Sequence, residues 1–279
     1  MATWVGDWAG AISSWCQTLV FLTFALWESV APARPGQVPV IRRWGVNFLL
    51  WGVMLAILSS ARPTTLAAGL LGITAGTSLF GAIGHLGGEW SILVAGLLLM
   101  DFASYVLHVV QHRVFLLWRF HAVHHSDIDM DLTTTLRHHP GETLISAALL
   151  GTAFALTGLP IWVTVVYGLL SIFGDLFNHA NIRIPVRVDA ALRTVLVTPR
   201  MHRVHHSSCP EHFGTNFGNL FSVWDRLFAT HRVLSAADEA AIRFGVPEFT
   251  APRYAGLAWG WILPFALRRD IRRGMLTGY

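Results

Sequence analysis

Long apolar runs, separated by short polar breaks, dominate the first part of the chain. We predict that three of these runs, residues 11–30, 45–60 and 91–109, cross a membrane as helices. Prolines within residues 31–35 end the first run, because a proline cannot continue a helix. Residues 64–88 are also apolar but rich in glycine, so this segment either crosses the membrane or lies in it as a re-entrant or interfacial stretch.

The second half of the chain alternates apolar and histidine-rich segments. Residues 143–157 and 161–178 are apolar and are separated by Thr-Gly-Leu-Pro at 157–160. Each would form a helix of about 23–27 Å, slightly shorter than the hydrocarbon layer, which predicts a helical hairpin that dips into the membrane and returns. Residues 110–141 and 179–232, before and after this hairpin, are polar and rich in histidine.

The loop at residues 31–44 indicates the orientation, because it carries several arginines and such loops stay in the cytoplasm. If residues 64–88 do not span, the chain returns to the cytoplasm near residue 110, and the histidine-rich segments are cytoplasmic. If residues 64–88 do span, the number of crossings changes by one and the histidine-rich segments would lie on the opposite side. We prefer the first version.

These patterns predict an all-α integral membrane protein. About three transmembrane helices and a membrane-dipping hairpin would carry a cytoplasmic helical cap with a histidine-rich dimetal site. We divide the chain into an N-terminal transmembrane region at 1–96, a catalytic domain at 97–232 and a cytoplasmic or interfacial tail at 233–279, which holds a basic cluster at 268–273.

The composition supports a bilayer environment. Hydrophobic residues make up 53% of the chain, charged residues only 13%, and the mean hydropathy is +0.51, whereas soluble domains carry about 25% charged residues. The net charge of +4 does not indicate nucleic-acid binding, because the arginines lie at the ends of apolar segments. The two cysteines, Cys16 and Cys209, stand in unrelated contexts and provide no disulfide framework.

The histidines carry the candidate chemistry. Three clusters form one HxxxH and two HxxHH patterns, which contain His108, His112, His121, His124, His125, His202, His205 and His206. On a helix, residues four apart share a face, so each cluster either serves one metal ion or divides between two adjacent ions. Imidazole suits Fe, Zn, Cu or Ni, so ligand type does not name the metal. Eight histidines exceed the needs of one ion, which favours two.

The sequence around these clusters resembles the fatty acid hydroxylase/sterol desaturase superfamily, the membrane-bound histidine-box di-iron oxygenases. The similar segments are WRFHAVHHS at 118–126, DLTTTLRHHPGE at 131–142, NHANI at 178–182, TPRMHRVHHS at 198–207 and NFGNLFSVWDRLFAT at 216–230. The resemblance implies that the eight histidines ligate two iron ions, which zinc replaces in some purified preparations. It adds His139, in HHPGE, and His179, in NHANI, as two further ligands.

Three acidic residues accompany the predicted ligands. Asp101 lies two helical turns before His108, and a carboxylate inside an apolar span needs a partner, for which a ligand imidazole is one candidate. Asp175 lies four residues before His179, where some family members have a histidine; it is a ligand, an acceptor for a ligand, or a polar residue at the hairpin exit. We expect Asp101, Asp175 and Glu142 to orient imidazoles, and we assign no general acid or base.

The resemblance implies an O2-dependent enzyme that hydroxylates or desaturates a lipid, such as a sterol or a fatty-acyl or alkyl lipid. The substrate would enter sideways from the bilayer. Electrons would come from an external donor similar to cytochrome b5 or ferredoxin. Arg200 and Arg203, which flank the last histidine cluster, would dock that donor, bind a phospholipid head group or act as a positive anchor. The membrane would be the inner or plasma membrane in a bacterium and the endoplasmic reticulum in a eukaryote.

A histidine-based membrane protein that binds or transports metal without oxygenase activity is the alternative. Transport would need polar or histidine residues along the spans. The predicted spans are apolar apart from Asp101, and the histidines gather at one end, which favours the enzyme.

Overall fold

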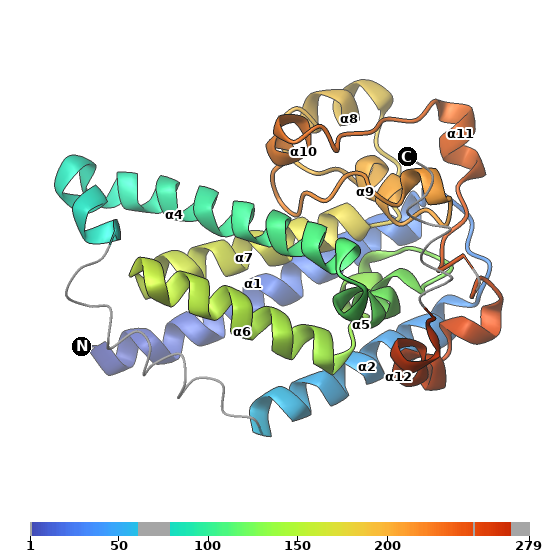
Figure 1. Ribbon diagram of the computed structural model, residues 1–279, viewed down its shortest axis with the longest axis horizontal. Helices are drawn as coiled ribbons and strands as arrows, with labels where there is room; N and C mark the ends of the chain where they lie inside the picture. The colour runs from blue at the N-terminus through green and yellow to red at the C-terminus, as the bar shows by residue number, and fades with distance from the viewer. Residues whose placement is uncertain (1, 61–78, 248, 269–279) are drawn as a thin grey trace.

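Five long helices form the body of the protein in the computed structural model, which describes residues 2–60, 79–247 and 249–268 (Figure 1). They are α1 (Ala2–Val30), α2 (Val40–Ser60), α4 (Leu79–Arg113), α6 (Pro140–Thr157) and α7 (Ile161–His179). They extend along the long axis of the molecule, and the shorter elements gather at one end (Figure 1). Within the described residues the only β-structure is three isolated bridges, so the prediction of an all-α protein is confirmed.

The shorter elements form a cap over that end of the long helices. They are α5 (Phe115–His125), η1 (Leu132–Leu136), α8 (Val186–Leu192), α9 (Pro199–His205), η2 (Pro210–His212), α10 (Val223–Leu227), α11 (Ala236–Ala241), η3 (Pro252–Ala255) and α12 (Leu257–Ala266). A buried cluster around Trp118 holds α5, the loop at Phe213 and α12 together, with Leu263 as the α12 contribution. The predicted tail beyond residue 233 therefore packs into the cap as far as it is described. Most of the basic cluster at 268–273 lies outside the described residues.

Three of the described helices are long and apolar enough to cross a membrane: Val40–Ile57, Gly87–Arg113 and Ile161–His179. The predicted number of three is confirmed, and the chain is a membrane protein. Two of the three correspond to the predicted spans 45–60 and 91–109, and the third is α7, the second arm of the predicted hairpin, which is long and apolar enough to cross. The first predicted span, residues 11–30, lies in α1, whose side chains before Ser14 are outside the described residues, so this span stays a prediction. Gly158 makes the turn between the arms, with a φ of 66° that other residues rarely adopt.

The third predicted span, residues 91–109, lies within a longer helix in the structure. α4 has a kink at Gly88, where φ is 68°, and continues to Arg113. Val114 is extended, so the chain turns and α5 packs against α4. This turn brings the HxxxH pattern of α4 next to the first HxxHH pattern on α5. Residues 61–78 lie outside the described residues, and with them most of the glycine-rich segment 64–88.

Two of the spanning helices meet closely. A Cβ atom on Gly96 of α4 would lie 2.6 Å from Cγ1 of Val163 and 2.8 Å from Cδ1 of Leu159, at the start of α7. A larger residue at this position would push the helices apart, because packed interiors leave little free space. The contact sets the distance between α4 and α7, which both deliver histidines to the site described next.

Candidate metal centre

Nine of the ten predicted ligands come together under the cap, in two buried groups. The first group contains His108, His112, His121, His125 and His205, and the second contains His124, His179, His202 and His206. Within each group one ligand atom from every residue lies within 4.8 Å of the others. The groups are neighbours, since the ring centroids of His125 and His206 are 4.3 Å apart.

Each HxxHH pattern divides between the two groups. On α5, His121 and His125 face the first group, because residues four apart share a helical face, and His124 faces the second. The arrangement is reversed at the second pattern. There, His202 and His206 belong to the second group, and His205 crosses to the first. The spacing thus supplies both metal positions from each helix.

The distances between imidazole nitrogens fit metal ions. Nε2 of His121 lies 3.1 Å from Nε2 of His108 and 3.2 Å from Nε2 of His125. In the second group, Nε2 of His202 lies 3.0 Å from Nε2 of His179. Metal–imidazole bonds of about 2.1 Å at right angles separate two nitrogens by about 3.0 Å. Converging nitrogens at this spacing suit a shared cation.

Outer hydrogen bonds turn several rings so that Nε2 faces the group. Nδ1 of His108 lies 2.8 Å from the carbonyl oxygen of Phe217, and Nδ1 of His205 lies 2.9 Å from that of Thr215. Nδ1 donates to the carbonyl in each case, so Nε2 carries the lone pair that is free to bind a metal ion. Nε2 of His205 is buried without a hydrogen-bond partner in the described part of the chain, as expected for a metal ligand.

Glu142 performs the same role for another ligand. Its carboxylate lies 2.7 Å from Nδ1 of His121 and 3.0 Å from Nδ1 of His138. The two imidazoles hold the pKa of Glu142 well below its usual value despite burial. Because an ionised Glu142 favours Nδ1–H on His121, it leaves Nε2 of that ring for the first group.

Burial favours the neutral form of the three imidazoles of the last histidine cluster, and this is the form that binds metal. The cap excludes water from His202 and His206, and this lowers the pKa of each well below the usual value. Burial likewise lowers the pKa of His205 to about 3. Neighbouring imidazoles oppose a positive charge on any one of these rings.

Acid should therefore destabilise the metal-free protein. His205 has a pKa of about 3 in the fold against 6.5 when unperturbed. The contribution of this buried neutral ring to the stability of the fold is complete above pH 6.5. It falls between pH 6.5 and 3, where only the unfolded chain binds the proton. Each buried ring of this kind lowers the free energy of unfolding by up to about 1.4 kcal/mol for every unit by which the pH falls in this range. The thermal midpoint of chelator-treated protein should be lower at pH 5.5 than at pH 7.5, and His205→Gln should reduce the difference. An equal or higher midpoint at pH 5.5 would contradict the buried neutral state.

The tenth predicted ligand, His139, does not join either group. Its Nδ1 accepts the amide N–H of Gly141 at 3.0 Å, and its ring contacts Phe120 and Trp261. Its neighbour His138 stacks on His124, with ring centroids 4.7 Å apart. The side chains of these two adjacent residues in HHPGE therefore point in different directions. The turn before α6 points His138 towards the histidine groups and His139 away from them.

The carboxylates of the two remaining acids accept hydrogen bonds from residues other than the described histidines. Asp101 accepts hydrogen bonds from the Trp224 indole at 2.8 Å, the Tyr167 hydroxyl and two backbone amides of the 220–221 segment, and from none of the described histidines. The suggested bond from Asp101 to a ligand is therefore wrong: the carboxylate anchors the loop that carries Phe217. For Asp175 it is the backbone carbonyl that meets Nδ1 of His179, at 2.8 Å.

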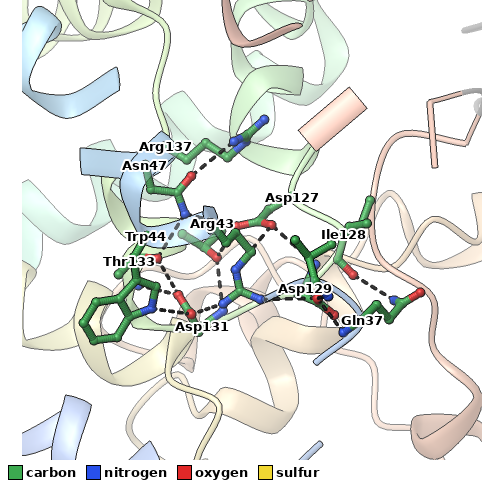
Figure 2. Close-up of polar contacts among 12 residues, drawn as sticks. Gln37, Arg43, Trp44, Asn47, Asp127, Ile128, Asp129, Asp131, Thr133 and Arg137 are labelled. Atoms are coloured by element: carbon green, nitrogen blue, oxygen red, sulfur yellow. Dashed lines mark hydrogen bonds and ion pairs between the residues drawn. The ribbon is translucent and has the colours of Figure 1, made fainter. Parts of the chain in front are cut away.

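A buried polar network behind α5 was not recognised in the sequence (Figure 2). Arg43, in the first turns of α2, lies between three carboxylates that directly follow α5 and form ion pairs with it, those of Asp127, Asp129 and Asp131 (Figure 2). The alternation of the three acidic residues is visible in the sequence. The sequence does not show that Arg43 is their partner, because this depends on how α2 packs against the cap.

Arg137 links this network to the helix that carries the ligands. It is fully buried, and its Nε donates to the carbonyl oxygen of Val123 at 3.0 Å and to Ser126, both at the end of α5. Its terminal nitrogen donates to Asn47 of α2 at 3.1 Å (Figure 2). The end of α5, next to His124 and His125, is thereby tied to a membrane-spanning helix.

A cavity of about 200 Å³ opens beside both histidine groups. Its walls include His121 and His124, and polar side chains such as Ser104, Gln111 and Asn219. Leu107 and Leu150 add apolar surface between them. The cavity is a place for a small part of a substrate next to both metal positions.

A protein-family comparison matches the part of the chain that holds both histidine groups. The family model described as fatty acid hydroxylase matches residues 93–230. Ornithine lipid hydroxylase OlsE of Rhizobium tropici is 35% identical over 50% of this chain and 41% of its own length. Alkylglycerol monooxygenase of Xenopus tropicalis is 31% identical over 47% of this chain and 28% of its own length.

A cholesterol 25-hydroxylase-like protein of Danio rerio is 29% identical over 50% of this chain and 54% of its own length. The chain thus spans about half or less of these relatives. No solved structure matches. The residues matched by the family model contain both histidine groups, and the chain belongs to the fatty acid hydroxylase/sterol desaturase superfamily.

Proposed function

We propose that this chain is an O2-dependent di-iron membrane oxidoreductase that hydroxylates, or desaturates, a lipid. The main support is the pair of adjacent buried histidine groups, which open onto one shared cavity at the end of membrane-spanning helices. The names of the relatives refer to an ornithine lipid, alkylglycerol and cholesterol, so a lipid is the substrate class they have in common.

The ligands in this proposal are the nine grouped histidines, with iron as the native metal and zinc as a substitute in purified protein. Iron bound there would activate O2 for cleavage of a C–H bond, with electrons from an external donor. Hydroxylation consumes one O2, two electrons and two protons and yields an alcohol and water. Glu142 and the backbone carbonyls hold the imidazoles in place, and the cap keeps bulk water away from the reacting carbon.

We place this chemistry on the cytoplasmic face, where a cytochrome b5-like or ferredoxin-like donor has access. The support is the arginine-bearing loop 31–44, which lies at the same end of the long helices as the cap (Figure 1). The membrane lipid would bring its reactive carbon to the cavity from the side of α4 and α6, which supply Leu107 and Leu150.

Product analysis tests the proposal. The full chain, loaded with ferrous iron without oxygen in lipid nanodiscs, would receive a chemical reductant, a lipid extract and isotopically labelled O2. We expect lipids that carry one labelled oxygen atom, or lipids that lack two hydrogens. Metal uptake into vesicles without any oxidised lipid would favour the transport alternative and contradict the proposal.

A further inference from the structure

A second cavity of the described protein is separate from the histidine groups. It has a volume of about 650 Å³ and lies between the loop before α2, the segment after α7, helix α9 and the α11 region. None of the grouped histidines lines it. This volume is within the range of about 300–1,000 Å³ that is typical of small-molecule sites.

The wall of this cavity is strongly basic. Six arginines line it, namely Arg34, Arg43, Arg183, Arg200, Arg203 and Arg243, against two carboxylates, Asp129 and Glu239. Both carboxylates are already engaged. Glu239 accepts from Arg200 at 2.7 Å and from Arg203 at 3.0 Å, and Asp129 accepts from two backbone amides and pairs with Arg43. Arg43 is also paired with Asp127 and Asp131, so the cavity arginines that form no ion pair with the described residues are Arg34, Arg183 and Arg243.

The cavity lies at the depth where lipid head groups begin. Residues 33–37 come just before the spanning segment of α2, and residues 181–186 follow the end of α7. Large aliphatic side chains are exposed beside it: Val30 is 76% exposed, Ile41 82% and Val186 63%. A basic recess next to exposed aliphatic residues suits an amphiphile with an anionic head group.

We propose that this cavity binds the phosphate-bearing head group of an anionic phospholipid, at a site separate from the catalytic cavity. Arg183 and Arg243, which are exposed at its rim, attract the phosphate, and the acyl chains lie along the aliphatic residues. Arg200 and Arg203 lie on α9 together with His202 and His205. The lipid therefore contacts the helix that supplies both metal positions. The assignment does not depend on the proposed oxygenase activity.

Native mass spectrometry of the metal-loaded protein in a neutral detergent tests the site. Titration with phosphatidylglycerol should show one lipid bound per chain in preference to phosphatidylcholine. Arg183→Gln combined with Arg243→Gln should weaken this binding roughly 30-fold, since each arginine near a lipid surface contributes about 1 kcal/mol. Arg187→Gln combined with Arg253→Gln removes the same charge from exposed positions outside the cavity and should leave the binding unchanged.

Metal content shows that both double variants are folded. Equal losses in the two variants, or equal binding of phosphatidylcholine, would overturn the proposal, because the attraction would then be non-specific. Complete displacement of the lipid by millimolar inorganic phosphate would also overturn it, in favour of a soluble anion. Retention of the lipid in the presence of phosphate supports the head-group site.

Discussion

His206→Ala should remove most of the metal from the second histidine group. That group has four histidines and would keep three, whereas His205→Ala leaves four in the first group. Loss of a partner that merely orients a ligand lowers metal affinity about 10–100-fold, and loss of a ligand should cost at least about 100-fold. We expect about one metal ion per chain in His206→Ala after dialysis against a weak chelator, and a smaller loss in His205→Ala.

Elemental analysis of the purified chain measures this difference. His139→Ala is the matched control, because His139 lies outside both groups and contacts aromatic side chains instead. Its metal content should equal that of the unmodified chain. A loss in His139→Ala as large as in His206→Ala would show that the division into these two groups is wrong.

Arg137→Met should produce the largest loss of stability among substitutions outside the ligands. Methionine has a similar length but donates no hydrogen bond, so the amide oxygen of Asn47 loses the guanidinium donor and the carbonyl of Val123 and the hydroxyl of Ser126 each lose hydrogen bonds from it. Removing one partner from a buried charged network costs about 3–5 kcal/mol. Because α5 loses its connection to α2, we also expect weaker metal binding at His124 and His125.

Thermal unfolding followed by circular dichroism, together with metal content, measures both effects. Arg42→Met is the control, because Arg42 is exposed on the same helix as Arg43 and Asn47. Surface substitutions usually change stability by less than about 0.5 kcal/mol. A midpoint for Arg137→Met equal to that of Arg42→Met would contradict the structural role of the network.

The buried network shows why part of the site escapes sequence reasoning. The alternation of Asp127, Asp129 and Asp131 is visible in the chain, but their common partner Arg43 is more than eighty residues away and at the start of an apolar run. From the sequence alone, an arginine at the start of an apolar run is interpreted as an anchor at the membrane interface. Only the packing of α2 against the cap makes it the centre of a buried cluster.

The difference between His138 and His139 has a similar cause. Both lie in one motif, and residue type alone cannot distinguish them. The turn that starts α6 directs His138 towards Glu142 and His124, and leaves His139 against Phe120. Side-chain direction depends on backbone angles at that turn, which local spacing does not report.

The sequence by itself determined the membrane character, the helical class and eight of the nine grouped histidines, because apolar run length and i, i+4 spacing are local properties. The ninth, His179, followed from the resemblance to the family. The tertiary structure alone decided which histidines share a metal position. Each HxxHH pattern has one face for each group, and only the fold of α5 and α9 against α4 and α7 determines which faces meet. It also decided that Asp101 holds a loop, since this depends on contacts between distant parts of the chain.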